Sequence, residues 1–213
     1  MIGTMGAIFL DRDGVINLNR ADHVKSWNEF EFIPGALESI HELTTTGLPI
    51  FVVTNQAGVN RGLMTVDVLE DIHKHMLAEI ERGGGHVEKV FYCPHDNHEN
   101  CACRKPNAGM LKQAAQEFGV DLRQSVIVGD AWTDIGAGAE VGAHGILVMT
   151  GRGRWNFVPS WHRFGLAFGA ACDLADATTM IKQALKGETI YATPRMRDAF
   201  HMALRDPEDS LVF

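Results

Sequence analysis

The chain has 213 residues, of which 46% are apolar and 22% are charged, as in an ordinary globular protein. Its 19 basic and 27 acidic residues give a formal net charge of −8. This charge disfavours binding to a nucleic-acid backbone, although a few local cations could still bind a small anionic substrate. The N-terminus has no basic region, and Asp11 ends its short apolar run, so neither a signal peptide nor a membrane span is predicted. We expect a cytoplasmic monomer that keeps its thiols reduced.

Short apolar runs typical of strands alternate with helical patterns along the first two thirds of the chain. Strands are predicted over 7–11, 49–54, 87–93, 125–130 and 144–149, and helices over 35–46, 65–82, 107–118 and 133–141. The third strand is less continuously apolar than the others and is expected near an edge of the sheet. Strands that are apolar on both faces and alternate with helices predict an α/β fold, in which a Rossmann-like parallel sheet carries helices on both faces.

The pattern weakens after Gly151. We predict a loop with aromatic anchors over 151–165, a helix over 174–186 and a polar tail from Gly187, with one helix around 195–204. Trp155, Trp161 and Phe164 could anchor the loop to the core or form an interface. Because there is no internal repeat or low-complexity linker, we expect one domain over 1–186, with the tail 187–213 packed on it.

Polar residues directly follow three of the predicted strands. Asp11-Arg12-Asp13 follows the first strand, Thr54-Asn55-Gln56 the second and Gly129-Asp130 the fourth. The carboxyl ends of parallel strands meet at one edge of a sheet, so these side chains are expected to lie together. Carboxylates that converge there repel each other unless a divalent cation neutralises them, and oxygen ligands suit Mg²⁺. Beside a phosphate, one carboxylate can attack phosphorus and a second can transfer protons.

Phosphoryl transfer also needs donors for the phosphate oxygens. Thr54 offers a hydroxyl followed by backbone amides, and Lys105 offers a full charge. Each residue alone has a plainer interpretation: Asp11 and Asp13 as solvated acids of a turn, Thr54 as a strand residue and Lys105 as a surface lysine. Their combination favours a site.

Four segments, DRDGV, VVTNQ, CRKP and VGDAWTD, together resemble the motifs of the haloacid dehalogenase-like phosphatases over residues 7 to about 150. FEFIPGALESI, VVTNQAGVNRG and the CPH…CxCRKP segment are similar to one subfamily, which contains D-glycero-D-manno-heptose 1,7-bisphosphate phosphatases and histidinol-phosphate phosphatases. The resemblance implies Asp11 as nucleophile and Asp13 as general acid and base. It also implies Mg²⁺ on Asp11, the backbone carbonyl of Asp13 and Asp130.

The same resemblance implies that Thr54 and Lys105 bind the transferring phosphoryl group and that Arg104 contributes to substrate recognition. Asp134 matches a position that is usually not a metal ligand. Heptose-bisphosphate phosphatases often have a lysine after the Gly-Asp of the last motif, where this chain has Ala131. Any role of that lysine is expected to be missing.

The stretch CPHDNHENCACRKP carries three of the four cysteines. Cys93-x-His95 and Cys101-x-Cys103 predict a closed tetrahedral Cys₃His zinc site, which is structural and places the following Arg-Lys pair. Cys101 and Cys103 are too close in sequence for the usual disulfide geometry. His98 could compete with His95 as a ligand. The remaining Cys172 is expected to be a small buried residue.

The gaps between the motifs leave no room for a folded cap domain, so an open site is expected, walled by the zinc loop and residues 17–28. Substrate contacts are predicted at Asn19, Arg20, Ala21, Asp22, Thr54, Asn55, Gln56, Ala57, Arg104 and Lys105. Arg20 and Lys25 are cations suited to a second phosphate. The FEFIPG stretch favours a heptose bisphosphate, whereas the short zinc loop favours histidinol phosphate, which stays the alternative. A non-catalytic binding module, a phosphotransferase and a nucleic-acid end phosphatase are further alternatives, each less favoured.

Overall fold

A single parallel sheet of six strands forms the centre of the computed structural model, which describes residues 6–165, 167–188 and 195–196. The strand order is β3-β2-β1-β4-β5-β6. The strands are β1 (Ile8–Leu10), β2 (Ile50–Asn55), β3 (Lys89–Cys93), β4 (Val126–Gly129), β5 (His144–Val148) and β6 (Phe168–Ala171). The prediction that 87–93 lies at an edge is confirmed, since β3 pairs with β2 alone among the described strands.

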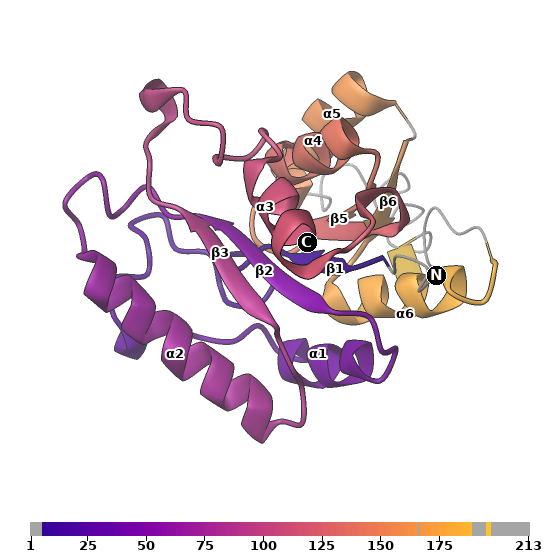
Figure 1. Ribbon diagram of the computed structural model, residues 1–213, viewed down its shortest axis with the longest axis horizontal. Coiled ribbons are helices and arrows are strands. Elements are labelled where there is room, and N and C mark those ends of the chain that lie inside the picture. Colours follow the sequence, from indigo (N-terminus) through magenta and orange to yellow (C-terminus); the bar gives the residue numbers. More distant parts are fainter. Residues whose placement is uncertain (1–5, 166, 189–194, 197–213) are drawn as a thin grey trace, which may run out of the picture.

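Helices cover both faces of the sheet (Figure 1). They are α1 (Ala36–Thr44), α2 (Val66–Arg82), α3 (Gly109–Phe118), α4 (Trp132–Val141), α5 (Gly153–Phe164) and α6 (Leu174–Ala184), with short 3-10 turns η1 (Trp27–Glu29), η2 (Asn97–Glu99) and η3 (Leu122–Gln124). Alternation along β1 shows why two layers form. Ile8 and Leu10 pack with α1, α2 and α6, whereas Ala7 and Phe9 pack with α3 and α4. Every residue of β1 is therefore buried.

The strand order reverses at β1. The chain runs from β1 outward through β2 to β3, then returns to pair β4 with the other side of β1 and continues outward to β6. In sheets of this kind a crevice opens beyond the carboxyl ends of the two central strands. Asp11 directly follows β1 and Asp130 directly follows β4, so the fold brings both acids to this crevice.

One prediction for residues 151–171 is wrong, and one strand there was not predicted. The expected loop over 151–165 is largely the helix α5, and a sixth strand, β6, follows it. Pro159 lies inside α5, and an internal proline normally indicates a break. β6 has the sequence Phe-Gly-Ala-Ala, whose small residues give little strand signal.

The aromatic anchors of this segment also differ from expectation. Trp155 and Trp161 are 74% and 51% exposed, so they do not anchor α5. Phe164 does pack against a small cluster that contains Phe168, as one of the two predicted alternatives has it, and Phe157, which was not predicted, joins it there. The helix expected over 195–204 lies outside the described residues except for Arg195 and Met196.

Two smaller features complete the description of the fold. Cys172 is only partly buried, and its Sγ lies 3.8 Å from Sδ of the buried Met196. Within the part of the chain that is described, no helix combines the length and the apolar character needed to cross a membrane.

Candidate active site

Three carboxylates meet at the crevice between β1 and β4. Oxygens of Asp11, Asp130 and Asp134 all lie within 4.8 Å of one another, and all three residues are buried. The backbone at two glycines packs closely against the carboxylate of Asp130. A Cβ on Gly14 or on Gly151 would lie 2.2 or 2.4 Å from an oxygen of Asp130, and both glycines have positive φ. Glycine at these two positions lets the loops after β1 and β5 enclose the acids.

Lys105 provides one of the balancing charges. Its Nζ lies 3.0 Å from Oδ1 of Asp11 and 2.5 Å from Oδ1 of Asp134, and it donates a hydrogen bond to the carbonyl of Val53 at 2.7 Å. The lysine is itself buried. Burial lowers its pKa, but the charges of Asp11 and Asp134 outweigh that effect and raise it, so the amine stays charged. Asp134 therefore serves as a counter-ion to Lys105.

The acids themselves hold protons more tightly than isolated carboxylates. Burial, together with the charges of Asp134 and Asp13, raises the pKa of Asp11 to about 6 despite the nearby Lys105. Burial and the charge of Asp11 raise the pKa of Asp130. Burial and the charge of Asp130 raise the pKa of Asp134. Mutual repulsion in a dry site is the condition that a divalent cation relieves. The donor set fits a hard cation such as Mg²⁺.

Arg152 was not predicted from the sequence as a site residue, yet it contacts Asp130. Its backbone N–H donates to Oδ2 at 2.8 Å, Nε donates to the same oxygen at 3.3 Å and Nη2 donates to Oδ1 at 3.1 Å. Thus a cation does lie beside Asp130, although residue 131 is an alanine and not the lysine that the family resemblance led us to expect. It comes from the residue that precedes α5.

The side chain of Asp13 points to a separate polar network. Its carboxylate accepts two hydrogen bonds from Arg12, at 2.8 and 2.9 Å, one from Asn17 at 2.9 Å and one from Gln56 at 2.7 Å. Burial would raise the pKa of Asp13, but the charge and hydrogen bonds of Arg12, with those of Asn17 and Gln56, lower it overall. Arg12 is fully buried. Asp13 is thus ionised in this arrangement.

Residues at the end of β2 and directly after it position the other site residues. Gln56 donates from Nε2 to Thr54 Oγ1 at 2.9 Å as well as to Asp13. Asn55 holds the backbone of Lys105 from both sides, accepting from its N–H and donating to its carbonyl, each at 3.1 Å. Gln56 was predicted as a substrate contact, but its side chain is buried and lies outside the cavity lining.

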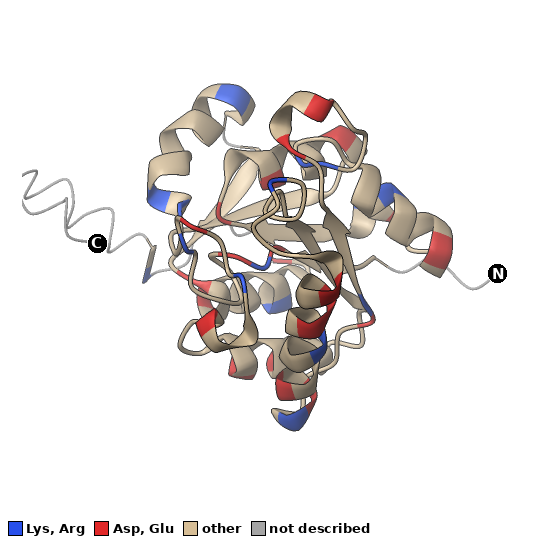
Figure 2. Cartoon of the chain, turned by 90° about the vertical axis from the view of Figure 1, so that its left-hand side faces the viewer, with Lys and Arg blue, Asp and Glu red and all other residues tan. Residues whose placement is uncertain are grey.

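A cavity of about 680 Å³ opens over these groups. Figure 2 shows basic and acidic residues interspersed along the chain on the side that faces the viewer. Predicted residues that line the cavity are Asp11, Asp13, Asn19, Arg20, Ala21, Thr54, Asn55, Ala57, Arg104 and Lys105. His23, Asn97 and Asn100 also line it and belong to the two segments that were predicted as its walls, whereas Arg61 and Arg152 line it without having been predicted. Asp22 and Lys25 form an exposed ion pair with each other instead, at 2.6 Å.

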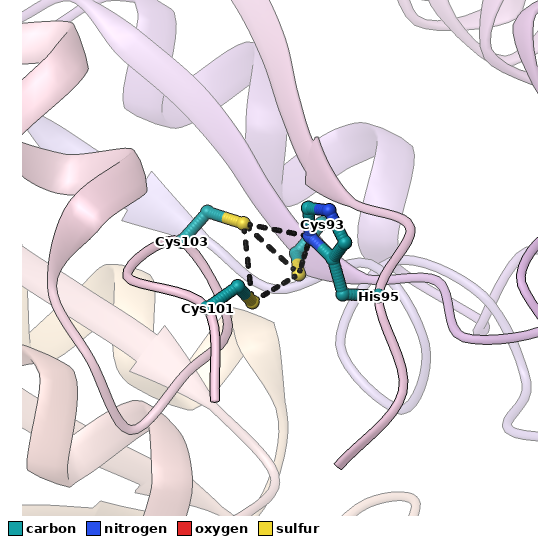
Figure 3. Close-up of side chains that lie close together, drawn as sticks. All are labelled: Cys93, His95, Cys101 and Cys103. Atoms are coloured by element: carbon teal, nitrogen blue, oxygen red, sulfur yellow. Dashed lines mark hydrogen bonds between the residues drawn. The ribbon is translucent and has the colours of Figure 1, made fainter. Parts of the chain in front are cut away.

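The cysteine stretch forms a compact cluster at the rim of this cavity (Figure 3). Cys93 Sγ lies 3.5 Å from Cys101 Sγ and 3.2 Å from Cys103 Sγ, and the latter two are 3.4 Å apart. His95 Nδ1 lies 3.5 Å from Cys93 Sγ and 3.2 Å from Cys103 Sγ. These separations are far longer than a disulfide and close to the roughly 3.8 Å edge of a tetrahedron with zinc–sulfur bonds of about 2.3 Å.

The donor types and their spacing fit a closed zinc site. Burial and a hydrogen bond to Cys103 raise the pKa of Cys93 well above its usual range, so without a metal its thiol stays protonated. His98 does not belong to the four-residue cluster. The stretch between the two ligand pairs is tied to the neighbouring loop by Arg61, which makes two hydrogen bonds of 2.8 Å to Asp96.

Comparisons with known proteins place the chain in a family. Residues 102–159 match a family model described as HAD-hydrolase-like. The D-glycero-β-D-manno-heptose-1,7-bisphosphate 7-phosphatase of Pseudomonas aeruginosa is 41% identical over 146 residues, 68% of this chain and 82% of that protein. The chain belongs to the haloacid dehalogenase-like phosphatases. It is therefore a phosphoric monoester hydrolase.

Further comparisons agree. The enzyme of the same name from Bordetella bronchiseptica is 41% identical over 150 residues, 70% of this chain and 84% of that protein. A crystal structure of D,D-heptose 1,7-bisphosphate phosphatase from B. bronchiseptica, complexed with magnesium and phosphate, superposes with a TM-score of 0.78 at 37% identity, covering 84% of this chain and 99% of that chain. The enzyme from Burkholderia thailandensis has a TM-score of 0.64 at 29% identity, covering 83% and 98%.

These findings confirm the predicted fold class and family. Between Asp11 and Lys105 the described chain contains α1, β2, α2, β3 and short turns. No folded cap is therefore inserted in this part of the structure.

Proposed function

We propose that the protein is a magnesium-dependent phosphatase that removes the 7-phosphate of D-glycero-β-D-manno-heptose 1,7-bisphosphate through an aspartyl-phosphate on Asp11. The observation that carries the proposal is the placement of Asp11, Asp130 and Lys105 together at the floor of a cavity lined by further cations. The similarity to enzymes of this name, at about 40% identity, supports the substrate.

In the first half of the proposed reaction, a carboxylate oxygen of Asp11 forms a bond to phosphorus while the bond from phosphorus to the sugar oxygen breaks. Mg²⁺, held by Asp11, the backbone carbonyl of Asp13 and Asp130, would neutralise charge on the phosphate oxygens. Lys105 and the hydroxyl of Thr54 hold the same oxygens by charge and hydrogen bonding.

Asp13 moves the proton. It protonates the departing sugar oxygen, and in the second half it removes a proton from the water that attacks the aspartyl-phosphate, so one group serves as acid and then base. In the absence of substrate, Arg12, Asn17 and Gln56 lower the pKa of Asp13 and so keep its carboxylate ionised. A phosphate ester brings negative charge beside it, which raises its pKa and favours the protonated form that the first half requires.

We propose that zinc on Cys93, His95, Cys101 and Cys103 has a structural role. Arg104 follows the last ligand, donating from Nε to Asn97 at 2.7 Å and from Nη1 to the carbonyl of His95 at 3.2 Å. The cluster thereby holds Arg104 and the adjacent Lys105 at the cavity. In this view the metal positions cations and takes no part in the reaction.

The charge of the cavity favours a bisphosphate over histidinol phosphate. Arg20, Arg61 and Arg104 line it in addition to Lys105. A second phosphate would gain from these cations, whereas the amine of histidinol phosphate would be repelled by them. One observation favours histidinol phosphate instead: the zinc loop is short, with five residues between His95 and Cys101.

Phosphate release from both compounds, measured with and without Mg²⁺, tests the proposal. We expect Mg²⁺-dependent release of one phosphate from the heptose bisphosphate and a much lower kcat/KM for histidinol phosphate. The reverse ratio would overturn the substrate, and equal release without any divalent cation would overturn the mechanism.

The nucleophile has its own test. Asp11→Asn should lower kcat by at least about a thousandfold, because it removes the group that attacks phosphorus. Its circular dichroism and melting temperature should stay close to those of the wild type, since the amide removes one of three mutually repelling acids. Asp67→Asn, on the exposed first turn of α2, is the matched control and should be fully active. A fully active Asp11→Asn variant would exclude the assignment.

A further inference from the structure

Asp130 is paired with a protein cation at the position where the proposed function needs a metal ion. Its side chain is fully buried, and both oxygens accept hydrogen bonds from Arg152, one from the backbone N–H and two from the guanidinium. No other described residue forms an ion pair with Asp130. A metal ion at Asp130 would have to share these oxygens with the guanidinium, and two cations at one carboxylate repel each other.

The two cations around the carboxylates differ in how firmly they are held. Lys105 is buried and contacts Asp11, Asp134 and the carbonyl of Val53. The side chain of Arg152 is 53% exposed, and the residue lines the cavity. Because half of the Arg152 side chain already faces water, its ion pair is partly screened and the guanidinium can move into solvent without opening the core. Arg152 is therefore the cation that can leave.

We propose that Arg152 is a built-in counter-cation, which neutralises Asp130 in the metal-free protein and is displaced when Mg²⁺ binds. This inference rests on the magnesium site of the proposed function. Arg152 acts through Asp130 and is a positioning residue: its three hydrogen bonds hold the buried carboxylate in one orientation until the metal arrives. The guanidinium therefore stabilises the metal-free protein but weakens the apparent affinity for Mg²⁺.

Magnesium binding to the zinc-loaded protein, measured by titration calorimetry without substrate, tests this exchange. Arg152→Gln should bind Mg²⁺ roughly fivefold or more tightly than the wild type, and its metal-free form should melt at a lower temperature. Arg152→Lys keeps the charge but loses the paired hydrogen bonds, so its affinity should lie between the two. Arg154→Gln removes the same charge two residues further along α5 from an exposed position and controls for long-range electrostatics. Its affinity should stay within about twofold of the wild type.

Each outcome of this titration decides the proposal. If Arg152→Gln bound Mg²⁺ no more tightly than Arg154→Gln, competition by the guanidinium would be excluded while the magnesium site itself stood. If the wild type bound no Mg²⁺, the proposed function and this inference would fail together. Should Arg152→Gln not fold, Arg152→Lys supplies the comparison, and unchanged affinity in that variant would count against the exchange.

Discussion

The carboxylate cluster and the Cys₃His cluster are both suited to a divalent cation, but they are built in opposite ways. Asp11, Asp130 and Asp134 follow rigid strands of the sheet or lie on α4, and protein cations already contact each of them. Cys101 and Cys103 lie outside all helices and strands, in a segment that no strand pairs with. Its sulfur atoms contact one another and His95.

This contrast indicates what each metal does for the fold. Where lysine and arginine balance the acids, the polypeptide can keep its structure without a cation, and the metal is free to serve the reaction. Where thiols are gathered without a counter-charge, we propose that the binding energy of the metal holds the loop together. In this proposal the catalytic site is preformed, whereas the zinc loop depends on its ion.

Removal of zinc should have the largest effect on structure. A strong zinc chelator, or Cys103→Ser, should lower the activity at saturating Mg²⁺ by more than about tenfold, because Arg104 and Lys105 follow the last ligand directly. The melting temperature should fall by several degrees. Removal of Mg²⁺ alone by dialysis should leave the melting temperature nearly unchanged.

Cys172→Ser is the control for this experiment, because that thiol lies outside the cluster and contacts Met196. It should keep its zinc, measured by atomic absorption, and its activity. A zinc-free protein with full activity and unchanged melting would show that the loop stands without the metal, and the contrast between the two clusters would disappear.

Loss of Lys105 should affect activity strongly and stability moderately. Lys105→Met keeps most of the side-chain volume but removes the charge that contacts Asp11 and Asp134. We expect kcat to fall by about 10²- to 10³-fold and the free energy of unfolding to fall by about 3 kcal/mol, because Asp134 is left buried without its partner. Activity assays and urea denaturation measure the two effects.

A double variant separates these two roles of Lys105. Lys105→Met with Asp134→Asn should recover much of the stability, since no unpaired charge remains, while the activity stays low. Lys112→Met is the matched control, because its ion pair with Glu140 at 2.5 Å is exposed and should contribute less than about 1 kcal/mol. If Lys105→Met were as stable as this control, burial of Asp11 and Asp134 would not depend on the charge of Lys105.

The sequence predicted those parts of the site that local pattern and topology determine. Asp11 and Asp130 end apolar strands, and parallel strands bring their carboxyl ends to one edge, so their meeting follows from the strand order. The Cys-x-His and Cys-x-Cys pairs, likewise, constrain their own geometry through short spacing. The first prediction rests on the order of the strands, and the second on short spacing within one segment.

Contacts made by flexible side chains across the fold were not predictable in this way. Arg152 reaches Asp130 across 22 residues and the whole of β5, from the start of a segment whose proline and glycines indicated a loop. The direction of Gln56 was missed because a polar residue after a strand can point into the cavity or along its floor. Its hydrogen bonds to Asp13 and Thr54 belong to a network that also contains Arg12 and Asn17, and the strand pattern does not predict where these side chains lie.

The pH dependence of magnesium binding should be the smallest of these effects and the most specific to the carboxylate cluster. In the metal-free protein the pKa of Asp11 is raised to about 6, and burial raises those of Asp130 and Asp134 as well. Below pH 6 a proton therefore occupies a group that Mg²⁺ needs, and binding must release it. The affinity for Mg²⁺ should fall as the pH falls from 8 through 6 to 5 and level off above pH 7.

The same shift fixes the sign of a stability change. A carboxyl group with a raised pKa binds its proton more tightly in the folded than in the unfolded chain, so its contribution to metal-free stability is largest below about pH 4 and is lost as the pH rises through 6. Titration calorimetry and melting curves at pH 5, 6, 7 and 8, with and without Mg²⁺, test both trends. In Asp11→Asn the pH dependence of binding should flatten. An affinity that is constant from pH 5 to 8 in the wild type would mean that Asp11 is not a ligand. The carboxylates of the cluster would then serve only as ion-pair partners of Lys105 and Arg152.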